Sequence, residues 1–122
     1  MSKILIVDDL ATEIQVMKGV IANLGHEAIA VNDGEAGFAA AKQHKPDLIL
    51  MDVVMPKMDG YQTCRKLKKD PETAGIPIIM VTSKNNDTDR SWGLKQGAVD
   101  YIGKPFSPDD LSRAIRAHVK GI

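Results

Sequence analysis

The sequence predicts an α/β fold in which helices cover both faces of a five-stranded parallel sheet. Short apolar runs alternate with helical patterns along the chain, and this alternation is typical of strand–helix–strand units with right-handed crossovers. Strands that are buried on both faces form continuous apolar runs instead of alternating apolar and polar residues. On this basis the expected strands are residues 3–7, 28–31, 48–51, 78–81 and 101–103.

Five helices are expected after these strands, and most of them carry a recognisable start or stop signal. The first has one apolar face with a spacing of three or four residues, and Gly25 follows it. The second begins at Asp33 and cannot continue through Pro46. The fourth contains Gly93, which lowers helix propensity, and the fifth has Ser107 as N-cap. The expected ranges are 10–24, 34–44, 60–67, 85–96 and 108–119.

Length, charge and cysteine content restrict the class of protein. The 122 residues are enough for one domain with its own core, and we expect residues 1–122 to form that single domain. The sixteen basic and sixteen acidic residues cancel, which argues against nucleic-acid binding through phosphate contacts. No apolar run approaches the roughly 20 residues that cross a bilayer, and the single cysteine fits a reducing compartment. We therefore expect a cytoplasmic protein without nucleic-acid or membrane partners.

Polar side chains follow the ends of four expected strands. Asp8 and Asp9 follow the first strand and Asp52 the third, while Thr82 and Lys104 follow the fourth and fifth. In an open α/β sheet, ligands bind at the carboxyl ends of the strands, so these side chains should lie close together. Clustered carboxylates repel one another and need a cation. Oxygen ligands without histidine or cysteine favour Mg²⁺ over zinc.

These groups are suited to phosphoryl transfer, which needs a nucleophile, a metal ion and a cation near the phosphoryl oxygens. Asp52 can act as the nucleophile because a carboxylate can form an aspartyl phosphate. The adjacent pair Asp8 and Asp9 suits a shared metal ion, whereas Asp52 stands alone before a loop. Lys104 can neutralise a phosphoryl group, and the Thr82 hydroxyl can donate to one of its oxygens.

The residues around these positions resemble the signature of the response-regulator receiver domain, and the resemblance extends over the whole chain. It implies a doubly wound, flavodoxin-like sheet with strand order 2-1-3-4-5, for which the chemotaxis receivers are a standard example. It also implies a stand-alone receiver without an output domain. The matching segments are Ile6-Val7-Asp8-Asp9, Asp52 through Gly60, Val81-Thr82-Ser83 and Lys104-Pro105-Phe106.

The resemblance also implies a role for each site residue. Asp52 would be the phosphoacceptor, and a sensor histidine kinase would be the phosphodonor. Asp9, Asp52 and the backbone carbonyl of Val54 would ligate Mg²⁺, with Asp8 acting through a water on the metal. Lys104 would pair with the phosphoryl group, and its bond to Pro105 is expected to be cis.

The resemblance further implies a switch. Thr82 would move toward the phosphoryl group, and Tyr101 would rotate inward behind it. This would change the surface formed by the fourth helix, fifth strand and fifth helix, where a downstream target protein of a chemotaxis-like or type IV pilus system would bind. Alternatively, the receiver would act as a phosphate sink that drains phosphoryl groups from a shared kinase. Such a protein does not turn over external substrates, and we expect a monomer before phosphorylation. Residues 104–109 are closer in style to receivers of type IV pilus systems than to the flagellar chemotaxis receiver.

Other interpretations stay open. The fold could be retained only as an interaction module, a pseudo-receiver, although the intact set of site residues argues against this. A haloacid-dehalogenase-like phosphohydrolase would place a second aspartate where Val54 stands. A flavodoxin-like cofactor binder is disfavoured because the two aspartates after Val7 would repel a cofactor phosphate. Taken singly, Asp8 could cap the first helix, and Tyr101 could serve only in packing.

Overall fold

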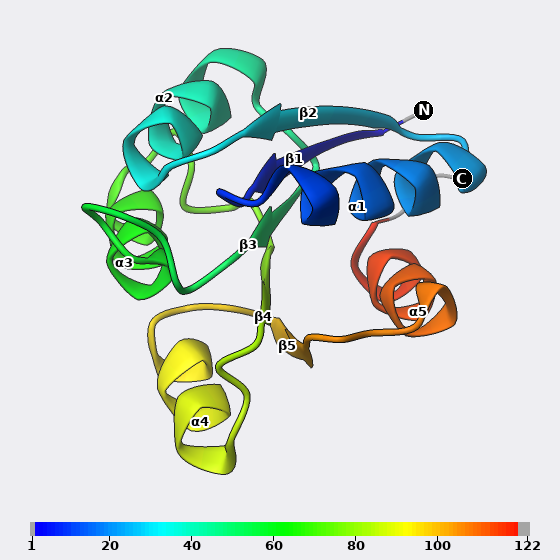
Figure 1. Ribbon diagram of the computed structural model, residues 1–122. Helices are drawn as coiled ribbons and strands as arrows, with labels where there is room; N and C mark the ends of the chain where they lie inside the picture. Colours follow the sequence, from blue (N-terminus) through cyan, green and yellow to red (C-terminus); the bar gives the residue numbers. More distant parts are fainter. Residues whose placement is uncertain (1, 120–122) are drawn as a thin grey trace.

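The computed structural model describes residues 2–119, which form a sheet between two layers of helices (Figure 1). Strands and helices alternate throughout the described chain, as the sequence predicts. The elements are β1 Lys3–Val7, α1 Ala11–Asn23, β2 Glu27–Val31, α2 Gly34–His44, β3 Leu48–Met51, α3 Gly60–Lys69, β4 Ile78–Thr82, α4 Asp87–Lys95, β5 Asp100–Gly103 and α5 Pro108–His118. Every helix among these is too short or too polar to cross a membrane.

The five strands are parallel and follow the order β2-β1-β3-β4-β5, so the predicted fold class and strand order are confirmed. From β1 the chain adds β2 on one side of the sheet and then β3, β4 and β5 on the other, so the order of the strands switches between β1 and β3. In sheets of this kind, that point opens a crevice at the carboxyl ends of the strands. Asp8, Asp52 and Lys104 lie directly after the ends of their strands, and Thr82 is the last residue of β4.

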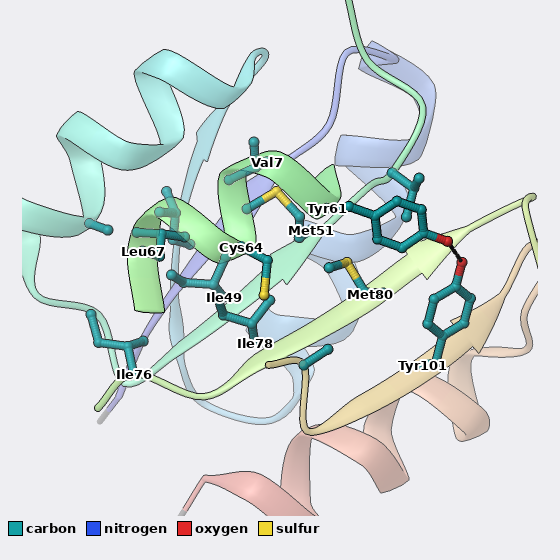
Figure 2. Packing of buried hydrophobic residues seen from close by; sticks show 14 of the residues in the cluster. Val7, Ile49, Met51, Tyr61, Cys64, Leu67, Ile76, Ile78, Met80 and Tyr101 are labelled. Carbon is teal, nitrogen blue, oxygen red and sulfur yellow. Dashed lines mark hydrogen bonds between the residues drawn. The ribbon is translucent and has the colours of Figure 1, made fainter. Parts of the chain in front are cut away.

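Two apolar clusters fix the sheet between the helix layers. On one face, Ile4 and Ile6 of β1 join the buried residues of α1 and α5. On the other face, Leu5 and Val7 of β1 pack with residues of α2 and α3, and Figure 2 shows part of this second cluster. Burial of each large aliphatic side chain contributes about 1.5–3 kcal/mol. The central strands therefore cannot shift without exposing apolar surface on both sides.

Several element boundaries differ by one or two residues from the sequence-based expectation. Leu10 was expected on the buried face of the first helix, but it is the extended N-cap residue of α1 and is half-exposed. α3 continues to Lys69 instead of ending at Leu67. α4 begins at Asp87 because the side chain of Asn86 accepts the backbone N–H of Asp89 in a capping box, which fixes the first turn.

Gly60, the first residue of α3, packs directly against the backbone of the segment that follows β3. A Cβ atom at this position would lie 2.2 Å from the carbonyl oxygen of Asp52 and 2.8 Å from the Cα of Val53. Gly19 in the middle of α1 has no atom within 4 Å of such a Cβ. The two glycines therefore differ in what a methyl group would meet.

We expect Gly60→Ala to destabilise the protein by about 1–3 kcal/mol, because backbone atoms must move to admit the methyl group. Gly19→Ala should instead stabilise it by about 0.5–1 kcal/mol, because alanine is the better helix former. Chemical denaturation of both variants measures these changes. Equal effects of the two substitutions would contradict the close approach at Gly60.

Candidate functional site

Three carboxylates meet at the carboxyl ends of β1 and β3. One oxygen from each of Asp8, Asp9 and Asp52 lies within 4.8 Å of the others. Asp8 and Asp52 are buried, with 0% and 5% of their surface exposed, whereas Asp9 is exposed. Lys104, after β5, places its Nζ 2.7 Å from Asp8 Oδ2 and 3.5 Å from Asp52 Oδ2. Four of the five residues expected from the sequence to converge therefore do so.

Backbone hydrogen bonds hold these residues level with one another. The N–H of Asp52 donates to the carbonyl of Val7 (2.9 Å), which extends the β1–β3 ladder to the residue after β3. The N–H of Lys104 donates to the carbonyl of Thr82 (2.9 Å) in the same way. The Lys104–Pro105 peptide bond is cis, as expected.

The carboxylates of Asp8 and Asp52 also bind the loops that follow them. Asp8 Oδ1 accepts the N–H of Leu10 (2.9 Å), and Asp52 Oδ1 accepts the N–H of Val54 (3.3 Å). The interpretation of Asp8 as the N-cap of the first helix is therefore wrong, since Leu10 occupies that position without a side-chain cap. Asp8 instead turns the chain toward α1 while its other oxygen holds Lys104.

The surroundings raise the pKa values of both Asp52 and Lys104. Burial raises the pKa of Asp52, and the charge of Asp8 adds to this, while Lys104 and a hydrogen bond from Thr82 act in the opposite sense. Burial alone would lower the pKa of Lys104, but the hydrogen bond to Asp8 and the charges of Asp52 and Asp8 outweigh it. The lysine is therefore firmly cationic, and the carboxylates around it exceed its charge.

The oxygen atoms of this cluster fit a hard divalent cation. Mg²⁺ binds oxygen at about 2.1 Å, so ligands on opposite sides of the ion are about 4.2 Å apart. The 4.8 Å limit on the three carboxylate oxygens is close to that span, and a small side-chain movement or one bridging water closes the difference. No histidine or cysteine belongs to this cluster within residues 2–119, which disfavours zinc.

A cavity of about 450 Å³ opens above Asp52 and leads to solvent. Asp8 and Thr82 are fully buried and do not line this cavity. We call it the strand-end cavity, and its lining residues are Asp9, Leu10, Glu13, Asp52, Val54, Ser83, Lys104 and Pro105. It gives a small phosphorylated group and several waters access to the Asp52 carboxylate.

Comparison with known proteins agrees with this geometry. Residues 4–116 match the response regulator receiver domain. The chain belongs to this family. It is 45% identical to the protein PilH of Pseudomonas aeruginosa, and the alignment covers 99% of this chain and 100% of PilH. It spans about half the length of several transcriptional regulators that it also matches.

Two solved structures of receivers are similar to this chain. The chemotaxis protein CheY4 of Vibrio cholerae is 28% identical, with a TM-score of 0.91 over 98% of this chain and 99% of CheY4. The receiver domain of the sensor histidine kinase PA1611 of P. aeruginosa is 31% identical, with a TM-score of 0.88 over 96% of both chains. That domain has a magnesium ion coordinated in its active-site cleft. Two-component signalling, expected from the sequence, is therefore confirmed as the class of this receiver.

Tyr101 of this receiver lies inward, with 3% of its surface exposed. Its hydroxyl lies 3.1 Å from the hydroxyl of Tyr61 (Figure 2) and donates to the backbone carbonyl of Lys84. The Tyr61 hydroxyl also reaches the backbone carbonyl of Asp89 (3.1 Å). Two hydroxyl hydrogens can serve only two of these three contacts at once. The two tyrosines thus connect α3, β5 and the start of α4.

Sequence reasoning did not identify Tyr61 or Glu13 as parts of the site. Tyr61 and Tyr101 are 40 residues apart, and no local pattern relates them. Glu13 is an acid in the first turn of a helix, a placement already explained by the helix dipole. Gly93 was noted only as a weak point of the fourth helix. The structure explains it, since a Cβ there would lie 2.7 Å from the Tyr101 ring.

Asp52→Asn should stabilise the metal-free protein at pH 7, because the amide removes a buried charge. We expect a higher Tm than that of the parent in thermal denaturation with EDTA. The gain should shrink as the pH falls toward 3.8, the ordinary value for the pKa of this carboxyl, because protonated Asp52 carries no charge. Asp9→Asn, at an exposed position, should change Tm less. A lower Tm for Asp52→Asn would contradict the raised pKa.

Gly93→Ala should destabilise the receiver by about 1–3 kcal/mol, although alanine favours a helix by about 1 kcal/mol over glycine. The reason is the contact of the new methyl group with the Tyr101 ring. In a Tyr101→Ala background the same substitution should become stabilising. Denaturant titration of the four proteins gives the coupling, and strictly additive effects would rule out this packing.

Proposed function

We propose that this protein is a response regulator in which Asp52 accepts a phosphoryl group from a sensor histidine kinase in a Mg²⁺-dependent reaction. The observation that carries the proposal is the position of Asp52. Its carboxylate lies at the floor of the strand-end cavity, next to two further carboxylates and 3.5 Å from the Lys104 ammonium. Nucleophile, cation-binding oxygens and a positive charge are the parts that phosphoryl transfer to a carboxylate requires.

Each residue has a distinct part in this proposal. Asp9, Asp52 and the backbone carbonyl of Val54 would hold the Mg²⁺ ion, and Asp8 would act through a water. When bound, the ion supplies positive charge against the phosphoryl oxygens. Asp52 would provide the attacking oxygen. Lys104 lies close enough to pair first with the Asp52 carboxylate and then with the phosphoryl group. The magnesium-bound relative supports this arrangement.

A chain of contacts supports Thr82 and Tyr101 as the switch. The Thr82 hydroxyl accepts the N–H of Lys84 (3.2 Å), and the carbonyl of Lys84 accepts the Tyr101 hydroxyl. If Thr82 turned toward a phosphoryl oxygen, Lys84 would lose one contact, and the acceptor of Tyr101 would be free to move. Tyr101 already lies inward here, so we propose that phosphorylation changes how firmly it is held in place.

The surface of α4, β5 and α5 is the proposed binding site for a downstream target protein. Exposed apolar side chains of α4 and of the segment before β5 support it, namely Trp92 and Leu94, each 48% exposed, and Val99, 42% exposed. The likeness to PilH over its full length supports residues 1–122 as a single receiver domain. On the same ground we propose a role in type IV pilus motility. A cytoplasmic location and a monomeric state before phosphorylation are proposed from the sequence.

The alternative functions are less well supported. A pseudo-receiver would have no need of a buried lysine between two buried carboxylates, since such groups are costly to desolvate. A phosphohydrolase of the aspartyl-phosphate type would need a second acid two residues after Asp52. Val54 occupies that position. Its hydrocarbon side chain offers no group that could move a proton.

The decisive test is the intact mass of the protein after incubation with acetyl phosphate, with and without Mg²⁺. We expect the gain of one phosphoryl group only with Mg²⁺, and none for Asp52→Asn at any Mg²⁺ concentration. Lys104→Met should lower the yield strongly without changing the site of modification. Modification of Asp52→Asn to the same extent as the parent would refute Asp52 as the acceptor, and a parent that stays unmodified even with a cognate kinase would favour the pseudo-receiver.

A further inference from the structure

Glu13 is a fourth carboxylate at the site, and none of the roles above uses it. It lies in the first turn of α1 and lines the strand-end cavity together with Asp52 and Lys104. Its side chain is half-buried, and its negative charge contributes to the raised pKa of Lys104. A first-turn acid that served only the helix dipole could equally well point into solvent.

The charge balance of the cavity depends on Glu13. With the three aspartates ionised, Lys104 as the single cation leaves two negative charges, and ionised Glu13 makes three. Charges of one sign in a cleft with low-dielectric walls focus their field toward the opening. Such a field attracts a divalent cation and repels an anion that enters by the same path. Because Glu13 lines the cavity through which Asp52 is reached, it acts on both species as they approach Asp52.

We propose that Glu13 is an electrostatic selectivity residue of this site, which strengthens capture of the divalent cation and slows phosphorylation by small, highly charged phosphodonors. This inference rests on the proposed function of Asp52 as phosphoacceptor. Glu13 neither touches the reacting atoms nor ligates the ion in this scheme. It acts over a distance through its charge, so its effect weakens as salt increases.

The two consequences have opposite signs, and this separates a charge effect from structural damage. Glu13→Gln keeps the size of the side chain and removes its charge. At low ionic strength it should weaken Mg²⁺ binding about threefold, measured by isothermal titration without any phosphodonor. At saturating Mg²⁺ it should raise the rate constant for phosphorylation by acetyl phosphate, a dianion, about threefold. A misfolded site would lower both quantities.

Two comparisons sharpen the experiment. Phosphoramidate, which is mainly a monoanion at neutral pH, should show a smaller rate increase than acetyl phosphate, and both increases should fall toward none in about 1 M salt. Glu27→Gln is the matched control, because Glu27 is exposed at the start of β2, at the opposite end of the sheet. It should leave the Mg²⁺ affinity and both rates as in the parent.

Glu13→Gln with unchanged Mg²⁺ affinity and unchanged donor rates would overturn the proposal, as would a decrease in both. If the parent itself gains no phosphoryl group at saturating Mg²⁺, even with a cognate kinase, the proposed function of Asp52 fails. The Mg²⁺ titration still reports on Glu13 in that case, since an unchanged affinity rejects the cation part of the inference and a threefold loss supports it. The two failures are therefore distinguishable.

Discussion

The pairing of β1 with β3 is the constraint on which the site depends. The Asp52 N–H continues this ladder by donating to the carbonyl of Val7, and it thereby holds Asp52 beside Asp8 whatever charge the two acids carry. Their repulsion is not relieved by moving apart, because the strands below them are packed on both faces. Lys104, the residue after β5, relieves part of this repulsion. Core packing thus maintains an arrangement of charges that would disperse in a flexible chain.

This arrangement leaves an excess of negative charge, and that excess has a chemical use. A carboxylate whose pKa is raised by burial is poorly stabilised as an anion, and either a bound cation or a covalent bond to phosphorus relieves this state. Lys104 contacts both buried acids, so it can shift toward whichever oxygen gains negative charge. The same features that make this cluster of carboxylates unfavourable on its own therefore suit it to a phosphoryl group.

Much of the fold and most of the site could be predicted from the sequence, because short stretches of neighbouring residues indicate both. Buried parallel strands form apolar runs, and Asp8, Asp52, Thr82 and Lys104 each follow such a run directly. The contacts that could not be predicted join side chains on separate elements. The orientation of Tyr61 toward Tyr101 depends on how α3 and β5 meet, and the exposure of Leu10 depends on the turn that Asp8 makes. No spacing in the sequence encodes these relations.

The two tyrosine hydroxyls have a consequence for the kinetics of the receiver. Two hydrogens are shared among three contacts, so the network always holds one acceptor in reserve. When the Lys84 carbonyl moves, Tyr101 can donate to Tyr61, and Tyr61 can donate to the Asp89 carbonyl, so that no buried hydroxyl is left without a partner. Rearrangement then proceeds by exchange of acceptors instead of by breaking a bond outright. The contacts of the two hydroxyls with each other and with the Lys84 and Asp89 carbonyls can therefore be satisfied by more than one pattern of hydrogen bonds.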